Sequence, residues 1–228
     1  DLVGEADVVR VIALTWSTPA RLETSRIPHE EAVQELDATV RFWQRWTEHT
    51  RYEGPYRAAV ERSALAIKGL TDGRTGAVIA AATTSLPETM GGARNWDYRY
   101  TWVRDTTTML NALIRLGHDY ECRRFSQWIR TTTAGRADEI QIMYGIGGER
   151  ILTETELTHL SGYRGSRPVR IGNGAWSQTQ HDTYGWLLAS SWFNEAHGGS
   201  DGQHDDPHYE RFLEQIVELA IAEFDVTD

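Results

Sequence analysis

The spacing of apolar residues becomes helical after Pro28 and stays so through most of the chain, and this limits the fold more than any other feature. The first stripe recurs every three to four residues and predicts a helix that ends near His49. Gly54-Pro55 then favours a second helix start, because proline fits a first turn, and Gly69 is placed to end that helix. Later stripes predict helices containing residues 109–116, 120–129, 175–195 and 208–224. We therefore expect a main part that is all-α.

Two segments fall outside the helical pattern. Residues 7–16 are rich in β-branched side chains and predict a buried strand, which we interpret as the end of an N-terminal β domain. Residues 134–174 show little regular pattern beyond a short strand expected at residues 140–144. A connection of this length inside a compact domain is usually functional, so it is a candidate region for the site.

Charge and cysteine content exclude several classes of protein. The formal net charge of −10 argues against binding nucleic acid, whose phosphates would be repelled. No apolar run approaches the ~18 residues that cross a bilayer, so a membrane protein is not expected. The single cysteine, Cys122, forbids an intrachain disulfide and a cysteine-based zinc site. A reducing, cytoplasmic compartment is therefore favoured, and the sequence indicates no cofactor and no oligomeric state.

The chain starts at Asp1 with neither an initiator methionine nor a basic-then-apolar leader. We expect either that a signal was removed or that the chain was cut from a longer one.

The segment from Arg94 to Asp105 has the densest chemistry. It holds three Arg, two Asp, two Trp and two Tyr in twelve residues, immediately before a predicted helix. With a helix start near Thr101–Trp102, Arg104 and Asp105 fall in the first turn, where free N–H groups favour a carboxylate. Such a pair beside aromatic rings can exchange hydrogen bonds with sugar hydroxyls while a ring covers the sugar face. The alternative is a helix-start charge with its ion-pair partner.

A second candidate is the glycine-rich segment 162–174, which carries Arg164, Arg167 and Arg170. These arginines could hold an anion such as phosphate, could line a sugar cleft, or could be tied to acidic neighbours. No Walker pattern supports a nucleotide site, and no Gly-x-Ser-x-Gly elbow supports a serine nucleophile.

Two further features are not expected to be functional. Cys122 lies on an apolar helix face, so it is a poor nucleophile candidate. The histidines near the C-terminus flank a hydrophilic glycine-rich loop, where we expect no metal site; they are His197, His204 and His208.

Arg94-Asn95-Trp96-Asp97-Tyr98-Arg99-Tyr100-Thr101-Trp102-Val103-Arg104-Asp105 resembles the substrate-binding motif of glycoside hydrolase family 15, which contains glucoamylases, glucodextranases and bacterial trehalases. The resemblance runs from about residue 5 to the end, and further segments are similar to the bacterial members. They are Tyr52–Arg57, Thr83–Glu88, Met143–Ile146 and Gly162–Gly174.

The resemblance implies an N-terminal β-sandwich followed by an (α/α)6 barrel, a helical toroid of twelve helices. Residues 1–25 would be the end of the sandwich, 26–50 a linker helix and 51–228 the first part of an incomplete barrel. The motif also implies roles. Arg104 and Asp105 would bind hydroxyls of a terminal glucose, Tyr98 and Trp102 would line that subsite, and Arg167 and Arg170 would lie in the cleft.

The implied activity is that of an exo-acting, inverting α-glucoside hydrolase, which releases glucose from trehalose or from the non-reducing ends of α-glucans. One glutamate then acts as general acid and a second as general base. The family's general acid lies in a Trp-Glu segment, and no such dipeptide occurs here. We therefore assign no catalytic residue to this chain and expect the fragment alone to be inactive. A disaccharide phosphorylase-like enzyme and a non-catalytic sugar-binding remnant remain alternatives, and the bacterial-type loops favour trehalose.

Overall fold

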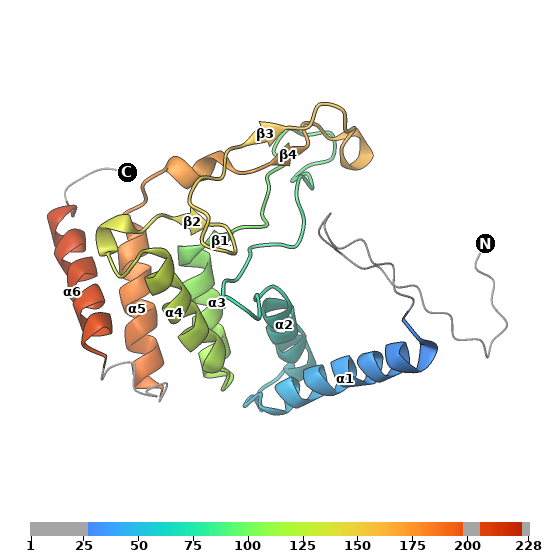
Figure 1. The fold of residues 1–228 in the computed structure, drawn as a ribbon, viewed down its shortest axis with the longest axis horizontal. Coiled ribbons are helices and arrows are strands. Elements are labelled where there is room, and N and C mark those ends of the chain that lie inside the picture. Colours follow the sequence, from blue (N-terminus) through green and yellow to red (C-terminus); the bar gives the residue numbers. More distant parts are fainter. Residues whose placement is uncertain (1–26, 198–205, 225–228) are drawn as a thin grey trace. The chain divides into compact units, whose positions relative to one another are not determined.

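The computed structural model describes residues 27–197 and 206–224, and the chain divides into two compact units, Asp1–Glu48 and His49–Asp228. The part of the chain so described is mostly helical, with six α-helices and two small two-stranded sheets (Figure 1). The sandwich tail expected at 1–25 and the strand expected at 7–16 lie outside the described residues.

The first unit contributes helix α1, His29–Glu48. Its first turn holds Glu30 and Glu31 and its last turn Arg45, so charges at both ends complement the helix macrodipole. The predicted helix and its end near His49 are thereby confirmed. None of its side chains is buried.

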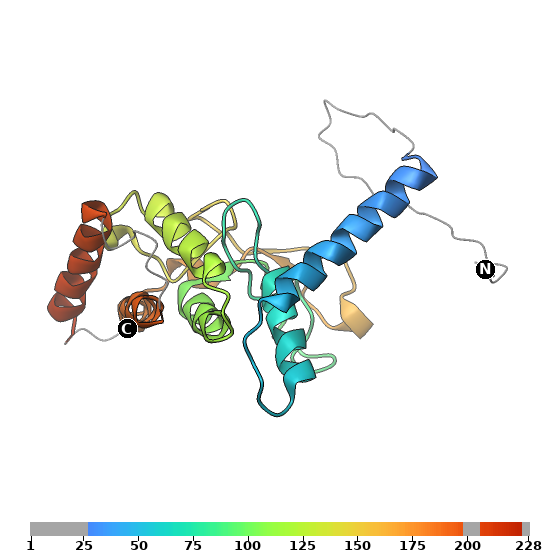
Figure 2. The ribbon, with the colours of Figure 1, turned by 90° about the horizontal axis from the view of Figure 1, so that it is seen from below.

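The second unit holds the other five helices, and each contains a predicted apolar stripe. Their bounds are α2 Arg57–Gly69, α3 Val103–Arg115, α4 Tyr120–Thr132, α5 Asp182–Ala196 and α6 Pro207–Ala222. Helices α3 and α5 run side by side, α4 packs against α3, and α6 packs against α5 (Figure 1 and Figure 2). The described part of the main segment is thus mostly helical, as predicted, but it also contains the two small sheets.

One predicted helix start is wrong. The helix expected from residue 175 begins only at Asp182, and Gly174–Ser177 forms a short 3₁₀ turn instead. Asn173 caps that turn by accepting a hydrogen bond from the Ala175 N–H at 3.0 Å. Residues 177–181 are all polar, so no apolar face favours continuing the turn into a helix.

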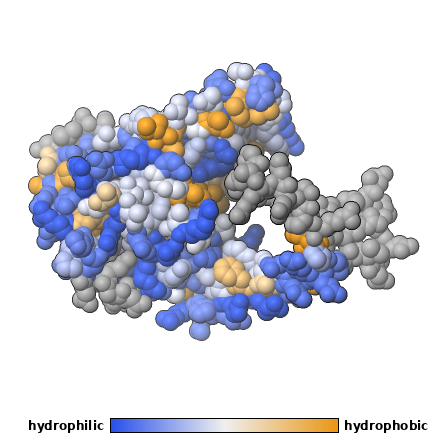
Figure 3. Space-filling model, in the orientation of Figure 1, coloured by the Kyte–Doolittle hydropathy of each residue, from blue (hydrophilic) through white to orange (hydrophobic). Residues whose placement is uncertain are grey.

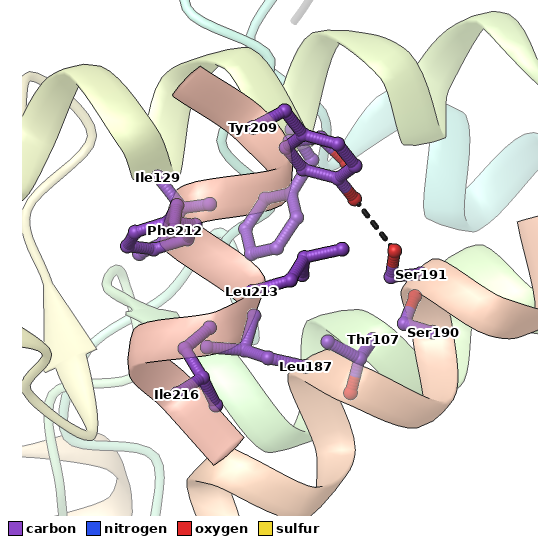
Figure 4. A pocket seen from close by; sticks show the side chains of 11 residues that line it. Thr107, Ile129, Leu187, Ser190, Ser191, Tyr209, Phe212, Leu213 and Ile216 are labelled. Atoms are coloured by element: carbon purple, nitrogen blue, oxygen red, sulfur yellow. Dashed lines mark hydrogen bonds between the residues drawn. The ribbon is translucent and has the colours of Figure 1, made fainter. Parts of the chain in front are cut away.

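Buried side chains of α3 to α6 form a shared core, including Leu110, Phe125 and Ile216, each at most 2% exposed. Among them lies a cavity of about 20 Å³, too small for any ligand larger than a water (Figure 4). At its edge the Tyr209 and Ser191 hydroxyls lie 2.8 Å apart (Figure 4). This satisfies two polar groups that burial would otherwise penalise.

Cys122, in the buried face of α4, is expected to be unreactive while the chain is folded. It is 2% exposed, and burial raises the pKa of its thiol to about 11, so about one thiol in a thousand is ionised at pH 8. Iodoacetamide labelling followed by mass spectrometry should be very slow at pH 8 and complete in guanidinium chloride. Rapid labelling of the native chain would contradict this packing.

Two long connections lie at the same end of the α3–α5 pair, residues 70–102 and 133–181 (Figure 1). Strand β1, Thr101–Trp102, pairs with β2, Met143–Tyr144, and so joins one connection to the other. Strand β3, Thr155–Glu156, pairs with β4, Arg170–Ile171. The irregular character predicted for 134–174 is confirmed, and the strand expected at 140–144 is reduced to β2.

Figure 3 shows a mostly hydrophilic surface in the orientation of Figure 1, with apolar patches in its upper part, over the long connections. In the second of these connections Ile151 and Ile171 are 70% and 40% exposed. Apolar side chains therefore line the same end of the unit where the charged motif lies.

Candidate functional site

The motif segment ends where α3 begins. The helix starts at Val103, one to two residues after the predicted start, and Arg104 and Asp105 lie in its first turn as expected. Asp182 occupies the corresponding first turn of α5. Because α3 and α5 are neighbours, the two helix starts bring three charged side chains together from distant parts of the sequence.

Arg104 is the centre of this cluster. Its Nη1 donates to Gln180 Oε1 at 3.2 Å and lies 3.5 Å from Asp182 Oδ2, while Nη2 lies 3.5 Å from Asp105 Oδ2. The side chains of Arg104, Asp105 and Asp182 are 40%, 46% and 44% exposed. The cluster is therefore open to a ligand and offers both charged donors and charged acceptors, which suits a polyhydroxylated molecule.

Two aromatic rings precede the cluster. Tyr98 and Trp102 lie with ring centroids 5.8 Å apart at an interplanar angle of 47°. Tyr98 is 38% exposed, and Trp102 is half-buried against the small core of Ile142, Met143 and Leu152. An anchored ring beside an exposed ring can cover the apolar face of a sugar. The structure thus brings Tyr98 and Trp102 together, and their contact with a sugar stays a prediction.

Asp97 ties the motif to the second connection. Its side chain is fully buried and forms a two-point pair with Arg99, at 2.9 Å to Nε and 2.7 Å to Nη2. The Gly172 N–H donates to Asp97 Oδ2 at 3.1 Å, and the Asn173 side chain donates to the Asp97 carbonyl at 3.1 Å.

The protonation of Asp97 follows from these contacts. Burial by itself raises the pKa of the carboxyl, but hydrogen bonds from the Arg99 side chain and backbone, the charge of Arg99 and the Gly172 N–H outweigh it. They hold the pKa of Asp97 below its ordinary value, so the ionised form is the one that binds the two connections together.

Arg170 is held inside the connections. Its side chain is 11% exposed, with Nε 3.1 Å from Glu154 Oε1 and the guanidinium 4.7 Å above the Trp96 ring. Its backbone N–H donates to Ser85 Oγ at 2.7 Å. These contacts match the alternative in which the arginines of the loop are tied to acidic neighbours. The predicted role of Arg170 in the cleft stays a prediction.

The other two arginines of the 162–174 segment have different surroundings. Arg167 is exposed, and Arg164 lies over the Tyr163 ring at 5.6 Å. With Arg170 occupied by carboxylates, the three guanidinium groups do not form a shared set available to one phosphate. The predicted cleft role of Arg167 stays a prediction.

Two hollows open beside the motif. The first, of about 290 Å³, is lined by Gln141, Trp176, Gln180 and Tyr184 among others, and so adjoins the partner of Arg104. The second, of about 640 Å³, is bordered by Arg99, Tyr100, Glu149 and Ile151 among others. Both volumes suit a small ligand, and both are lined by aromatic or apolar groups with a few polar ones, as in typical ligand sites.

Sequence reasoning missed Gln180 and Asp182 as members of the site. The sequence predicts a helix from residue 175 that would contain the polar run before Asp182, and in such a helix Asp182 would be an ordinary surface charge. The signal that could have identified them is that run itself, which favours a helix start at Asp182 rather than a helix interior.

Within residues 27–197 and 206–224, no three His, Cys, Asp or Glu side chains are grouped so as to hold a metal ion. His204 lies outside the described residues. None of the helices described is long and apolar enough to cross a bilayer.

Known proteins resemble this chain over most of its length. It is 49% identical to the trehalase of Mycolicibacterium smegmatis over 183 residues. This alignment covers 78% of this chain and 27% of that trehalase. The trehalase of Mycobacterium tuberculosis is 47% identical over 183 residues, and the alignment covers 78% of this chain and 26% of that trehalase. The trehalase of Thermoplasma acidophilum is 43% identical over 164 residues, and the alignment covers 72% of this chain and 28% of that trehalase. The chain therefore spans about a quarter of the length of these curated relatives.

A solved glycosidase structure covers 73% of this chain and 40% of that chain, with a TM-score of 0.49 and 20% identity. The family model for glycosyl hydrolases family 15 matches residues 54–228, which include the whole motif and both long connections. Because this match extends over most of its 228 residues and agrees with the resemblance of the Arg94–Asp105 motif, the chain belongs to glycosyl hydrolases family 15.

Proposed function

We propose that this chain forms the glucose-holding part of an exo-acting, inverting α-glucoside hydrolase of the trehalase type. The observation that carries the proposal is the exposed Arg104–Asp105 pair at the start of α3, with the contacting Tyr98 and Trp102 rings in the segment just before it. The Asp105 carboxylate would accept hydrogen bonds from sugar hydroxyls, and Arg104 would donate to hydroxyl oxygens. The rings would cover the C–H face of a terminal α-glucose.

The fold proposed for this function is an incomplete (α/α)6 barrel. The packing of α4 against α3 and of α6 against α5, with α3 and α5 adjacent, supports it, because a helical toroid alternates inner and outer helices in this way. The long connections at one end of α3 and α5 would then form the cleft of the barrel (Figure 1).

No general acid or base is proposed among these residues. Inverting hydrolysis needs two carboxyl groups about 6.5–9.5 Å apart on opposite sides of the scissile bond. Asp105 and Asp182 both lie 3.5 Å from Arg104, so both carboxylates are paired with a guanidinium and neither is assigned to proton transfer. The phosphorylase alternative would need Arg170 to hold phosphate, and the pairing of Arg170 with Glu154 argues against that alternative.

The single, buried Cys122 supports a reducing, cytoplasmic compartment.

Trehalose is the proposed substrate, since the three curated relatives compared above are trehalases. Titration of the 228-residue chain should show millimolar or tighter binding of trehalose and of maltose, which share a terminal α-glucose, and no binding of melibiose, whose terminal galactose misplaces one hydroxyl. No glucose should be released. Failure to bind any α-glucoside, or equal binding of melibiose, would overturn the proposal.

A chimera separates the hydrolase from a sugar-binding remnant. Residues 54–228 would replace the matching part of the M. smegmatis trehalase, which supplies the rest of that enzyme. A rate of trehalose hydrolysis, measured as released glucose, within about tenfold of that of the intact M. smegmatis trehalase would support the hydrolase hypothesis. A folded chimera that binds trehalose without hydrolysing it would favour the remnant.

A further inference from the structure

The Arg104 guanidinium is held from two sides by groups that belong to different helices. Asp105, from α3, lies 3.5 Å from Nη2. Asp182, in the first turn of α5, lies 3.5 Å from Nη1, and Gln180, just before that helix, lies 3.2 Å from it. An arginine on one helix is thus fixed by acceptors supplied from the neighbouring helix and the residues just before it.

We propose that Asp182, together with Gln180, is a positioning residue that holds Arg104 in the orientation needed to bind the terminal glucose. This inference rests on the proposed function, because it assumes that Arg104 contacts the sugar. An arginine side chain has many rotamers, and a guanidinium group that is fixed before the ligand arrives loses less conformational freedom on binding. The two α5-side acceptors occupy Nη1 and so restrict rotation of the whole guanidinium.

A purely local role for Asp182 is the competing explanation. A carboxylate in the first turn of a helix complements the macrodipole whether or not an arginine is near. Glu210 supplies a matched control, because it lies in the first turn of α6 and is exposed. Replacing Glu210 by Gln removes the same charge from the same kind of position, away from Arg104.

The first test measures trehalose affinity of the 228-residue chain by calorimetry or NMR titration. We expect D182N to weaken binding about tenfold and E210Q to leave it unchanged, with both variants still folded by circular dichroism. In an Arg104→Lys background, D182N should weaken binding less than twofold further, because a residue that acts through Arg104 has nothing left to position. A full tenfold loss in that background would overturn the proposal.

The second test moves the carboxylate. Gln180→Glu, added to D182N, places a negative charge beside Nη1 from outside the helix, and we expect it to restore affinity to within about threefold of wild type. A role in stabilising the α5 start would not be rescued from position 180, so an absence of rescue in a folded double variant would contradict the positioning role.

A third measurement needs no sugar. In arginine-¹⁵N-labelled chain, the Arg104 guanidinium signal should show restricted rotation in wild type and faster rotation in D182N. An unchanged signal would overturn the proposal. If the wild-type chain binds no sugar, the proposed function fails, and the signal then shows whether Asp182 still fixes Arg104 without a sugar-binding consequence. If wild type binds trehalose and D182N binds it equally well, only the positioning inference fails.

Discussion

Replacing Arg104 or Asp105 by Ala is expected to weaken trehalose binding about 100-fold, corresponding to about 2.7 kcal/mol. Each side chain would form charge-assisted hydrogen bonds to sugar hydroxyls, and each such bond contributes more than a neutral one. Asp105→Asn should lose most of this affinity although it keeps the shape, since the charge is removed. Titration calorimetry or NMR line-shape titration of the chain with trehalose measures the effect.

The control for this prediction is a second arginine–acid pair. Arg211 Nη1 lies 3.2 Å from Glu214 Oε2 on the exposed surface of α6, with both side chains about 60% exposed. Removing either partner should leave trehalose affinity unchanged, and all variants should unfold at temperatures close to that of wild type. A loss below threefold for Asp105→Ala would remove the residue from the proposed sugar contacts.

Asp97→Ala is expected to lower the free energy of unfolding by about 3 kcal/mol at pH 7. The Asp97 side chain is fully buried, whereas that of Arg99 is 44% exposed and can regain water. The loss therefore comes mainly from the Gly172 N–H, the bonds to Arg99 and the space left behind. Urea unfolding followed by tryptophan fluorescence measures it.

The chain offers a closely matched control for this variant. Arg136 and Asp138 form a pair with the same two-residue spacing and the same two-point geometry, at 3.1 Å and 2.5 Å, but both side chains are exposed. Asp138→Ala should leave the free energy of unfolding unchanged within error. Equal effects of the two substitutions would mean that burial of Asp97 does not decide its contribution.

The effect of Asp97 also has a defined pH dependence. The pKa of Asp97 is lower in the folded chain than the ordinary value of 3.8, so the folded state binds fewer protons than the unfolded state. The stabilisation is therefore complete above about pH 4 and is lost as the pH falls through the lower folded pKa. The difference in unfolding temperature between wild type and Asp97→Ala should therefore become smaller as the pH falls below about 4.

The helices could be predicted from the sequence because the apolar spacing that defines each one is local. The stripe around Leu110 and Leu113 placed α3, and with it Arg104 and Asp105 in a first turn. The start of α5 could not be predicted in the same way. Residues 177–181 carry no apolar period, and the end of the short turn capped by Asn173 depends on its surroundings.

The partners of the predicted site residues depended on the tertiary structure. Arg104 and Gln180 are 76 residues apart, and Arg170 is held by groups from both connections. Sequence spacing could not distinguish an Arg170 that lines a cleft from one tied to Glu154, since both fit the same residues. Burial and distance show that Arg170 is paired with Glu154.

By itself, the sequence determined the helical class, the position of the charged motif at a helix start and the family, because periodicity and motif are properties of neighbouring residues. Only the tertiary structure decided that α3 and α5 are adjacent, that Asp182 faces Arg104 and that Asp97 joins the two connections. The physical reason is that these contacts arise from packing of helices and connections that are distant in the sequence. Such packing brings together charges whose spacing along the chain gives no sign that they meet.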